Sequence, residues 1–258
     1  MISYKIFEKY NEIAHFCTTR QGGTSVGNYA SFNLSPFSGD DLRAVLNNQS
    51  KLAEWLGIDA DKIILPFQTH GTEVREISDR FFELADEEKR DYLNGVDAIF
   101  TRIPKVCIGV STADCVPILF YDPTKQIVAA AHAGWRGTCG RIAEKTINAL
   151  AETYSCHPSD ILVSIGPSIS AKVYEVGQEV VDNFEDAGFD IPEIVEIRNK
   201  SIYLDLWKAN EQSLLKAGVA AENIEVAGIC TFTEHERFFS ARRLGIKSGR
   251  LLSGIMLK

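Results

Sequence analysis

The feature that most constrains the fold of this chain is a series of unbroken apolar runs of strand length. Val, Ile and Ala fill several of them without the alternating polar residues that a strand with one wet face would show. Because such strands must be covered on both faces, the pattern favours sheets buried between other layers. The runs are "IAHFCTT", "KIILPFQTH", "VDAIFT", "VCIGVST", "VPILFY", "QIVAAAHA", "DILVSIG" and "IEVAGIC".

Four further stretches show the periodicity of amphipathic helices. The first, 40–57, gathers leucines on one side and ends at Gly57, a residue typical of helix C-termini. Helices and strands alternate only loosely, so we expect a mixed α and β fold rather than a doubly wound parallel sheet. The closely spaced strands 63–69 and 73–77 predict a hairpin. The other helical stretches are 140–154, 177–188 and 204–218.

Composition narrows the function classes. The 258 residues show no linker-like break, so we expect one domain over residues 1–258. A net charge of −8 with dispersed basic residues argues against a nucleic-acid surface. We expect no membrane span and no signal peptide, because no segment has the apolar length of either. The six cysteines form no CxxC pair, which predicts free thiols in a cytoplasmic protein.

Three metal-capable side chains lie at the ends of predicted strands, each beside an abrupt turn. His70 occurs in "FQTHG", Cys115 in "TADCVPILF" and His132 in "AHAGWRGT". Strand ends present side chains to a shared cleft, and a three-ligand set is typical of catalytic zinc, which keeps a fourth position open. The alternative is that they are ordinary packed residues, since spacings of 45 and 17 residues match no compact zinc motif.

Two loops carry polar groups suited to a ligand. In "GWRGT", Arg136 lies just ahead of a predicted helix, and a glycine-framed loop at a helix N-terminus is typical of anion sites. Alternatively, Thr138 caps that helix and Arg136 is solvated. The loop over 18–35 contains several glycines, with Arg20 and Asn33 near its edges, and loops of this length are commonly functional.

Longer motifs follow one another along the chain, among them "TRQGGTSVGNYASFNL", "QTHGTEV", "TADCVPILFYD", "AAAHAGWRGT", "LDLWKAN" and "FFSARR". In this order, from about residue 16 to residue 250, they resemble the YfiH-type family. Members of that family have been labelled laccase-like polyphenol oxidase, peptidoglycan editing factor and purine nucleoside phosphorylase. The resemblance implies a single YfiH-like domain of the α+β class, built as a four-layer α/β/β/α sandwich with mixed sheets.

The resemblance also implies a zinc ion held by His70, Cys115 and His132, with Arg136 joining them in catalysis. The implied reactions are phosphorolysis of adenosine, inosine, guanosine and methylthioadenosine, a transferase activity, and deamination of adenosine to inosine, a hydrolase activity. We therefore expect nucleoside and phosphate as partners, no nucleic acid or membrane, and a monomer or weak homodimer. The implied substrate contacts are Arg20, Asn33 and Gln68.

Two positions depart from the family pattern. Gln49 follows Asn48 in the first predicted helix, where the family pattern has arginine, and Ser38 precedes "GDD", where many members have histidine. If that arginine binds phosphate, phosphorolysis here is weak or uses another arginine. Arg136, with the helix that follows it, is the candidate from the sequence.

Other functions compete with a zinc nucleoside enzyme. If Cys115 is a nucleophile and His132 its base, the protein is an amidase that edits cell-wall precursors. A zinc ion could also serve such an amidase. A copper-dependent polyphenol oxidase is disfavoured, because five histidines and two methionines are too few for multicopper sites, although one copper ion is conceivable. A metal ion with four protein ligands and no open position would indicate a non-catalytic module that binds a metal or a small molecule. For deamination, Asp114 is a candidate proton shuttle.

Overall fold

Two β-sheets lie face to face at the centre of the molecule. A computed structural model describes residues 1–258. The first sheet has the order β1 (Ile13–Cys17), β13 (Leu251–Leu257), β5 (Cys107–Thr112), β2 (Ile63–Ile64). The second has the order β12 (Ile224–Val226), β8 (Leu162–Ile165), β6 (Val116–Asp122), β7 (Ile127–Ala133), β4 (Val96–Thr101), β3 (Glu73–Glu76). Both sheets combine parallel and antiparallel pairs, as predicted.

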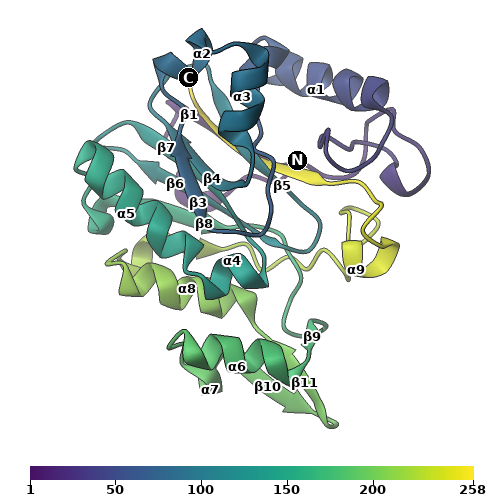
Figure 1. Ribbon diagram of the computed structural model, residues 1–258, viewed down its shortest axis with the longest axis vertical. Coiled ribbons are helices and arrows are strands. Elements are labelled where there is room, and N and C mark those ends of the chain that lie inside the picture. The colour runs from purple at the N-terminus through teal and green to yellow at the C-terminus, as the bar shows by residue number, and fades with distance from the viewer.

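Helices cover the outer face of each sheet and complete four layers, α/β/β/α (Figure 1). The helix α1 (Leu42–Leu56) packs Leu52 and Leu56 against Phe16 and Met256 of the first sheet. On the opposite side, α5 (Ile142–Tyr154) and α8 (Leu206–Lys216) pack against the second sheet. The α+β class and the layered arrangement predicted from the resemblance are therefore confirmed.

Smaller elements surround this sandwich. A three-stranded sheet of β10 (Val195–Arg198), β11 (Ser201–Leu204) and β9 (Glu175–Val176) lies with α6 (Gln178–Asp186) and α7 (Ile191–Ile194) at the lower end of Figure 1. The other helices are α2 (Asp79–Glu83), α3 (Asp86–Leu93), α4 (Trp135–Cys139) and α9 (Ala241–Leu244). Single 3-10 turns occur at Lys5–Phe7, Gly27–Tyr29, Ala60–Lys62, Pro158–Asp160 and Ala221–Asn223. None of the helices has the length and apolar character needed to cross a membrane.

The strand β7 shows why the apolar runs are unbroken. Its odd-numbered residues, Ala129 and Ala131 among them, pack in the core between the second sheet and its helices. Its even-numbered residues Val128 and Ala130 pack in the core between the two sheets. Because successive side chains of a strand point to opposite faces, a strand buried on both faces needs apolar residues at every position.

Two differences from the sequence prediction concern the central sheets. The hairpin expected between 63–69 and 73–77 is wrong, because β2 belongs to the first sheet and β3 to the second, and the chain between them crosses from one sheet to the other. The apolar pattern also does not predict β13, whose run is interrupted by Ser253 and Gly254. A Cβ at Gly254 would lie 2.7 Å from the Phe16 ring, so the close packing of β1 on β13 requires glycine there.

Asn48, a fully buried residue of α1, anchors the long loop over residues 18–35. Its side-chain oxygen accepts hydrogen bonds from the Thr24 backbone nitrogen at 2.9 Å and the Thr24 hydroxyl at 3.2 Å. Its amide nitrogen donates to three further oxygens of the loop, so every polar atom of the side chain is paired. The acceptors are Ser25 Oγ (3.1 Å), Ser31 O (3.1 Å) and Asn33 O (2.9 Å).

The substitution Asn48→Ala is expected to lower the free energy of unfolding by about 3 kcal/mol, because it leaves buried loop groups without partners. Urea denaturation measures this change. The neighbouring exposed residue supplies the control, since Asn47→Ala removes a side chain that makes no hydrogen bond and should leave stability within about 0.5 kcal/mol of the wild type. Equal stability of the two variants would contradict the anchoring role.

Candidate metal site

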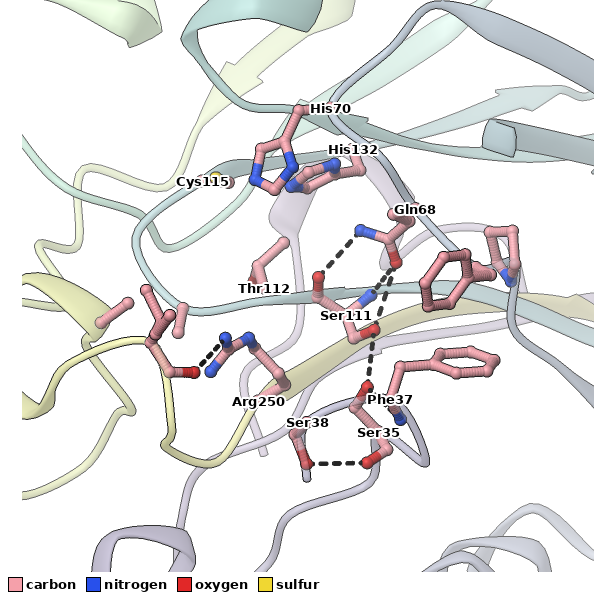
Figure 2. A pocket seen from close by; sticks show the side chains of 15 residues that line it. Ser35, Phe37, Ser38, Gln68, His70, Ser111, Thr112, Cys115, His132 and Arg250 are labelled. Atoms are coloured by element: carbon pink, nitrogen blue, oxygen red, sulfur yellow. Dashed lines mark hydrogen bonds between the residues drawn. The ribbon is translucent and has the colours of Figure 1, made fainter. Parts of the chain in front are cut away.

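Three side chains that are far apart in the sequence converge at one end of the second sheet (Figure 2). His70 lies in the loop after β2, Cys115 directly precedes β6, and His132 is the next-to-last residue of β7. One ligand atom from each lies within 4.8 Å of the other two. The structure thus brings the three predicted ligands together, and their placement suggests a metal.

Strand pairing explains why Cys115 meets His132. Pro117 lies opposite His132 in the antiparallel register of β6 and β7, so Cys115 lies at the same strand ends. Gly134 follows β7 and leaves room for the side chains. A Cβ there would be 2.9 Å from His70 Cδ2 and 3.1 Å from Cys115 Sγ, so a larger residue would displace the ligands.

A fully buried carboxylate, Asp97 on β4, positions both histidines. Its Oδ1 lies 2.8 Å from His132 Nδ1, an arrangement that assigns the proton to Nδ1 and leaves Nε2 for a metal. The same carboxylate accepts hydrogen bonds from the backbone nitrogens of Thr69 (3.2 Å), His70 (3.0 Å) and Gly71 (2.7 Å). These bonds hold His70 at a φ of 64°, which is uncommon for residues other than glycine.

The electrostatics of the site favour a thiolate. Burial opposes the charged form, but the charge of His132 and hydrogen bonds from both histidines lower the pKa of Cys115 to about 6. Burial also opposes protonation of His132, yet the charge of Cys115 and the hydrogen bond to Asp97 raise the pKa of His132 to about 9. The thiolate is the form of cysteine that binds metals.

The three ligands form part of the wall of a cavity of about 370 Å³. This volume lies in the range of small-molecule sites. The remaining wall comes from the loop after Asn33, the loop before His70, the end of β5 and the chain leading into β13. Its lining residues are Ser35, Phe37, Ser38, Pro66, Phe67, Gln68, His70, Ser111, Thr112, Ala113, Cys115, His132, Ala241, Ile246 and Arg250.

Gln68 is the predicted substrate contact that lines this cavity. Its Nε2 donates to the Ser111 carbonyl at 2.9 Å, and its Oε1 accepts from the Ser111 backbone nitrogen at 2.8 Å. These bonds attach the loop that carries His70 to β5 of the other sheet. Contact between Gln68 and substrate stays a prediction.

Asn33 and Arg20 lie outside the cavity lining. Asn33 is fully buried, and its Oδ1 accepts from the Arg250 backbone nitrogen at 2.9 Å. The Arg20 guanidinium donates to the carbonyls of Ala30 and His235, both at 2.9 Å. Both side chains therefore tie the long loop to the C-terminal part of the chain, and direct substrate contact by either one stays a prediction.

Arg136 also lies outside the lining, and it belongs to α4 rather than preceding a helix as the sequence suggested. Its side chain is exposed, with Cζ 4.2 Å from the centroid of the Trp135 ring. Thr138 does not cap a helix start, because its hydroxyl donates to the Ala133 carbonyl at 3.4 Å and accepts from Asn210. A catalytic role of Arg136 stays a prediction.

Asp114 supports the backbone around Cys115 instead of facing the cavity. Its Oδ1 accepts from the Thr231 hydroxyl at 2.7 Å, and its Oδ2 accepts from the Ser240 hydroxyl at 2.9 Å and the Arg242 backbone nitrogen at 2.7 Å. Both oxygens are thus occupied by structural donors. The structure does not support Asp114 as the proton shuttle.

The sequence patterns missed Asp97, Thr112 and Arg250. A signal existed for Asp97, because a carboxylate inside the apolar run "VDAIFT" must be paired when the strand is buried. No local pattern distinguished Thr112, at the end of an apolar strand, or Arg250, in the segment "ARRLGIKSGR" near the C-terminus, from surface residues.

A family described as "Multi-copper polyphenol oxidoreductase laccase" matches residues 14–258. The chain belongs to this family, which is the YfiH-type family that its motifs resemble.

Relatives and solved structures cover nearly all of the chain. It is 45% identical to a protein of Bacteroides thetaiotaomicron named purine nucleoside phosphorylase, over 100% of this chain and 96% of the relative. It is 44% identical to adenosine deaminase RL5 of an unknown prokaryotic organism, over 94% and 93%. The crystal structure of YlmD from Geobacillus stearothermophilus has a TM-score of 0.90 at 35% identity, covering 97% and 94%. The structure of Bacillus licheniformis YfiH also has a TM-score of 0.90, at 32% identity, covering 97% and 95%.

If the three side chains bind a metal, the substitution Asp97→Asn is expected to weaken the affinity for added zinc by about ten- to a hundredfold, because the amide cannot accept all the hydrogen bonds that orient His70 and His132. Competition with a chromogenic chelator measures the affinity. Asp122→Asn is the matched control, since this buried carboxylate at the other end of β6 accepts from the Thr124 and Lys125 backbone nitrogens, both at 2.8 Å. Similar zinc affinities for the two variants would contradict the role assigned to Asp97.

Proposed function

We propose that this protein is a zinc-dependent purine nucleoside enzyme. It phosphorolyses adenosine, inosine, guanosine and methylthioadenosine, and it deaminates adenosine to inosine. The observation that carries the proposal is the convergence of two imidazoles and one thiolate in the wall of a cavity of about 370 Å³. A set of three protein ligands leaves one position of a tetrahedral ion for substrate or water.

The surroundings of the three ligands fit zinc. The thiol of Cys115 is acidified, Asp97 fixes the ring of His132, and Gly134 provides the space that bulkier residues would fill. Mixed nitrogen and sulfur ligands suit this ion. When bound, zinc supplies Lewis-acid polarisation of an oxygen atom in the cavity.

An aromatic pair at the cavity suits a purine base. The rings of Phe37 and Phe67 lie edge to face with centroids 5.0 Å apart, and both line the cavity. The two residues are 48% and 42% exposed, which is unusual for paired large apolar side chains. Nucleobases stack on such aromatic faces, so the pair would hold the base while the ribose lies deeper in the cavity.

The names of relatives favour nucleoside chemistry, since one is a purine nucleoside phosphorylase and another an adenosine deaminase. The copper oxidase implied by the family description fits the ligand set less well. One group of three metal-capable residues is present, and of the five histidines only His70 and His132 belong to it. A multicopper oxidase needs several imidazole-rich copper sites.

A second candidate is a cysteine-dependent amidase, favoured by the short distance between Cys115 and His132. In that case the thiolate of Cys115 attacks a carbonyl carbon and His132 donates a proton to the leaving amine. A thiolate that binds a metal is not free to attack. An enzyme that is active without metal and inactivated by iodoacetamide would therefore favour the amidase.

Zinc-loaded protein is expected to convert adenosine to inosine without phosphate, and to release free purine and ribose 1-phosphate from inosine when phosphate is added. Chromatography of the products measures both reactions. A chelator should abolish both activities and added zinc should restore them. Neither product forming with zinc-loaded protein would remove the proposed function.

The substitution Cys115→Ser is expected to lower both rates by at least about a hundredfold, together with the zinc content, because the hydroxyl is a much weaker zinc ligand. Cys139→Ser is the control. That thiol lies outside the cavity and donates to the Asn183 carbonyl at 3.2 Å, a bond that a serine hydroxyl can replace. Full activity of the Cys115→Ser variant would contradict the metal site.

A further inference from the structure

One cationic side chain lines the cavity, and no carboxylate forms a salt bridge with it. Arg250 is the only lysine or arginine among the lining residues, and it takes part in none of the ion pairs of the protein. Burial lowers the pKa of Arg250, and the negative charges of Cys115 and Asp114 nearby offset only part of that loss of water. A partly buried charge without a partner is costly unless a ligand supplies the opposite charge.

Backbone carbonyls hold the guanidinium of Arg250 in place without neutralising it. Nη1 donates to the carbonyls of Ser248 at 2.7 Å and Gly249 at 3.1 Å, and to the Ser248 hydroxyl at 3.2 Å. Nη2 donates to the Ile246 carbonyl at 2.9 Å. All of these acceptors are uncharged. The side chain is therefore fixed at the cavity wall with its positive charge intact.

A second lining residue has an unused polar group. Thr112, the last residue of β5, is 1% exposed, and its hydroxyl has no hydrogen-bond partner in the protein. Buried hydroxyls are almost always paired, so an unpaired one in a cavity wall indicates a group that a ligand completes.

Sheet pairing places these two residues side by side. Leu251, the first residue of β13, lies opposite Thr112 in the antiparallel register, and Arg250 directly precedes it. In Figure 2, Thr112 lies between the metal ligands and Arg250. A ligand that bonds both groups would therefore lie in the cavity beside the metal site.

We propose that Thr112 and Arg250 form the phosphate-binding subsite of this cavity. The inference rests on the proposed function and names the group that binds its second substrate. The guanidinium supplies charge and the hydroxyl donates a hydrogen bond to a phosphate oxygen. In phosphorolysis, a phosphate oxygen forms a bond to C1′ of the ribose as the C1′–N9 bond breaks. The bonding electron pair leaves with N9, and the purine takes up the proton that the phosphate gives up.

This subsite supplies the arginine that the first helix lacks. Gln49, at the position where the family pattern has arginine, donates through Nε2 to the Leu34 carbonyl at 3.0 Å and is not in the cavity wall. Arg136, the candidate from the sequence, is exposed outside the cavity. Arg250 is the arginine that the fold brings to the cavity wall that holds the three candidate ligands.

The test compares Thr112→Val, Arg250→Gln and Arg250→Lys with the wild type in two reactions. Phosphorolysis of inosine uses phosphate, whereas deamination of adenosine does not. We expect the KM for phosphate to rise about tenfold in Thr112→Val and about a hundredfold in Arg250→Gln, with partial recovery in Arg250→Lys. Deamination of adenosine, which uses no phosphate, should fall by a much smaller factor than phosphorolysis in all three variants.

Two further measurements separate a ligand contact from a structural role. Thr112→Val removes a hydroxyl that has no protein partner, so its melting temperature should not fall. The rise in melting temperature that inorganic phosphate gives the wild type should shrink in Thr112→Val and Arg250→Gln. Lys247→Gln, which removes an exposed charge from the same loop, is the control and should match the wild type.

The outcomes are distinct. Equal loss of both reactions in Arg250→Gln, or an unchanged KM for phosphate in Thr112→Val, would overturn the subsite, as would an Arg136→Gln variant that alone raises this KM. If the wild type catalyses neither reaction, the proposed function fails. The phosphate-dependent melting temperatures then still decide whether Thr112 and Arg250 bind the anion.

Discussion

The geometry of the metal site depends on one buried carboxylate, that of Asp97. It is tolerated inside the second sheet because three backbone N–H groups and one imidazole donate to it. Each of those donors belongs to a segment that carries a candidate metal ligand. The bond to His132 selects a ring nitrogen, and the bonds to residues 69–71 set the path of a loop that has no regular structure of its own. One side chain therefore couples a strand of the sheet to a loop without regular structure.

The rigid part of the site comes from strand pairing, and the adaptable part from loops. Cys115 and His132 are placed by the register of β6 and β7, whose side chains are buried on both faces. His70, Gln68 and the aromatic pair lie on loops. Their positions depend on hydrogen bonds such as those between Gln68 and Ser111. Strand pairing thus fixes the positions of Cys115 and His132, whereas the shape of the cavity wall around them depends on the sequence of the loops.

Local patterns were sufficient for most elements of the fold. The helix expected over 40–57 occurs at Leu42–Leu56, and the strand "VDAIFT" matches β4. Periodicity reports how a segment is buried but not which sheet it joins, and for this reason the hairpin between 63–69 and 73–77 was wrong. Strand ends and residue types were likewise sufficient to propose the three ligands, because His70, Cys115 and His132 each follow or precede an apolar run.

The residues that sequence reasoning missed are those defined by long-range pairing. Asp97 meets His132 because Ala98 lies opposite Ala131 in the register of β4 and β7. Thr112 meets Arg250 because the C-terminal strand returns to pair with a strand from the middle of the chain. The local sequence indicates that Asp97 needs a partner but not which one, and it does not indicate that Thr112 lies beside Arg250, since register is fixed by the packing of whole sheets.

The cavity lies across the seam of the sandwich. Cys115 and His132 come from the second sheet, whereas Thr112 and Arg250 come from the first. The two halves of the site are therefore carried on separate rigid bodies whose spacing is set by the side chains packed between them. A substitution that enlarges or shrinks a side chain between the two sheets would change the distance between these two groups of residues. It would do so without replacing any residue of the site. The alignment of the two walls of this cavity is thus a property of the distance between the sheets.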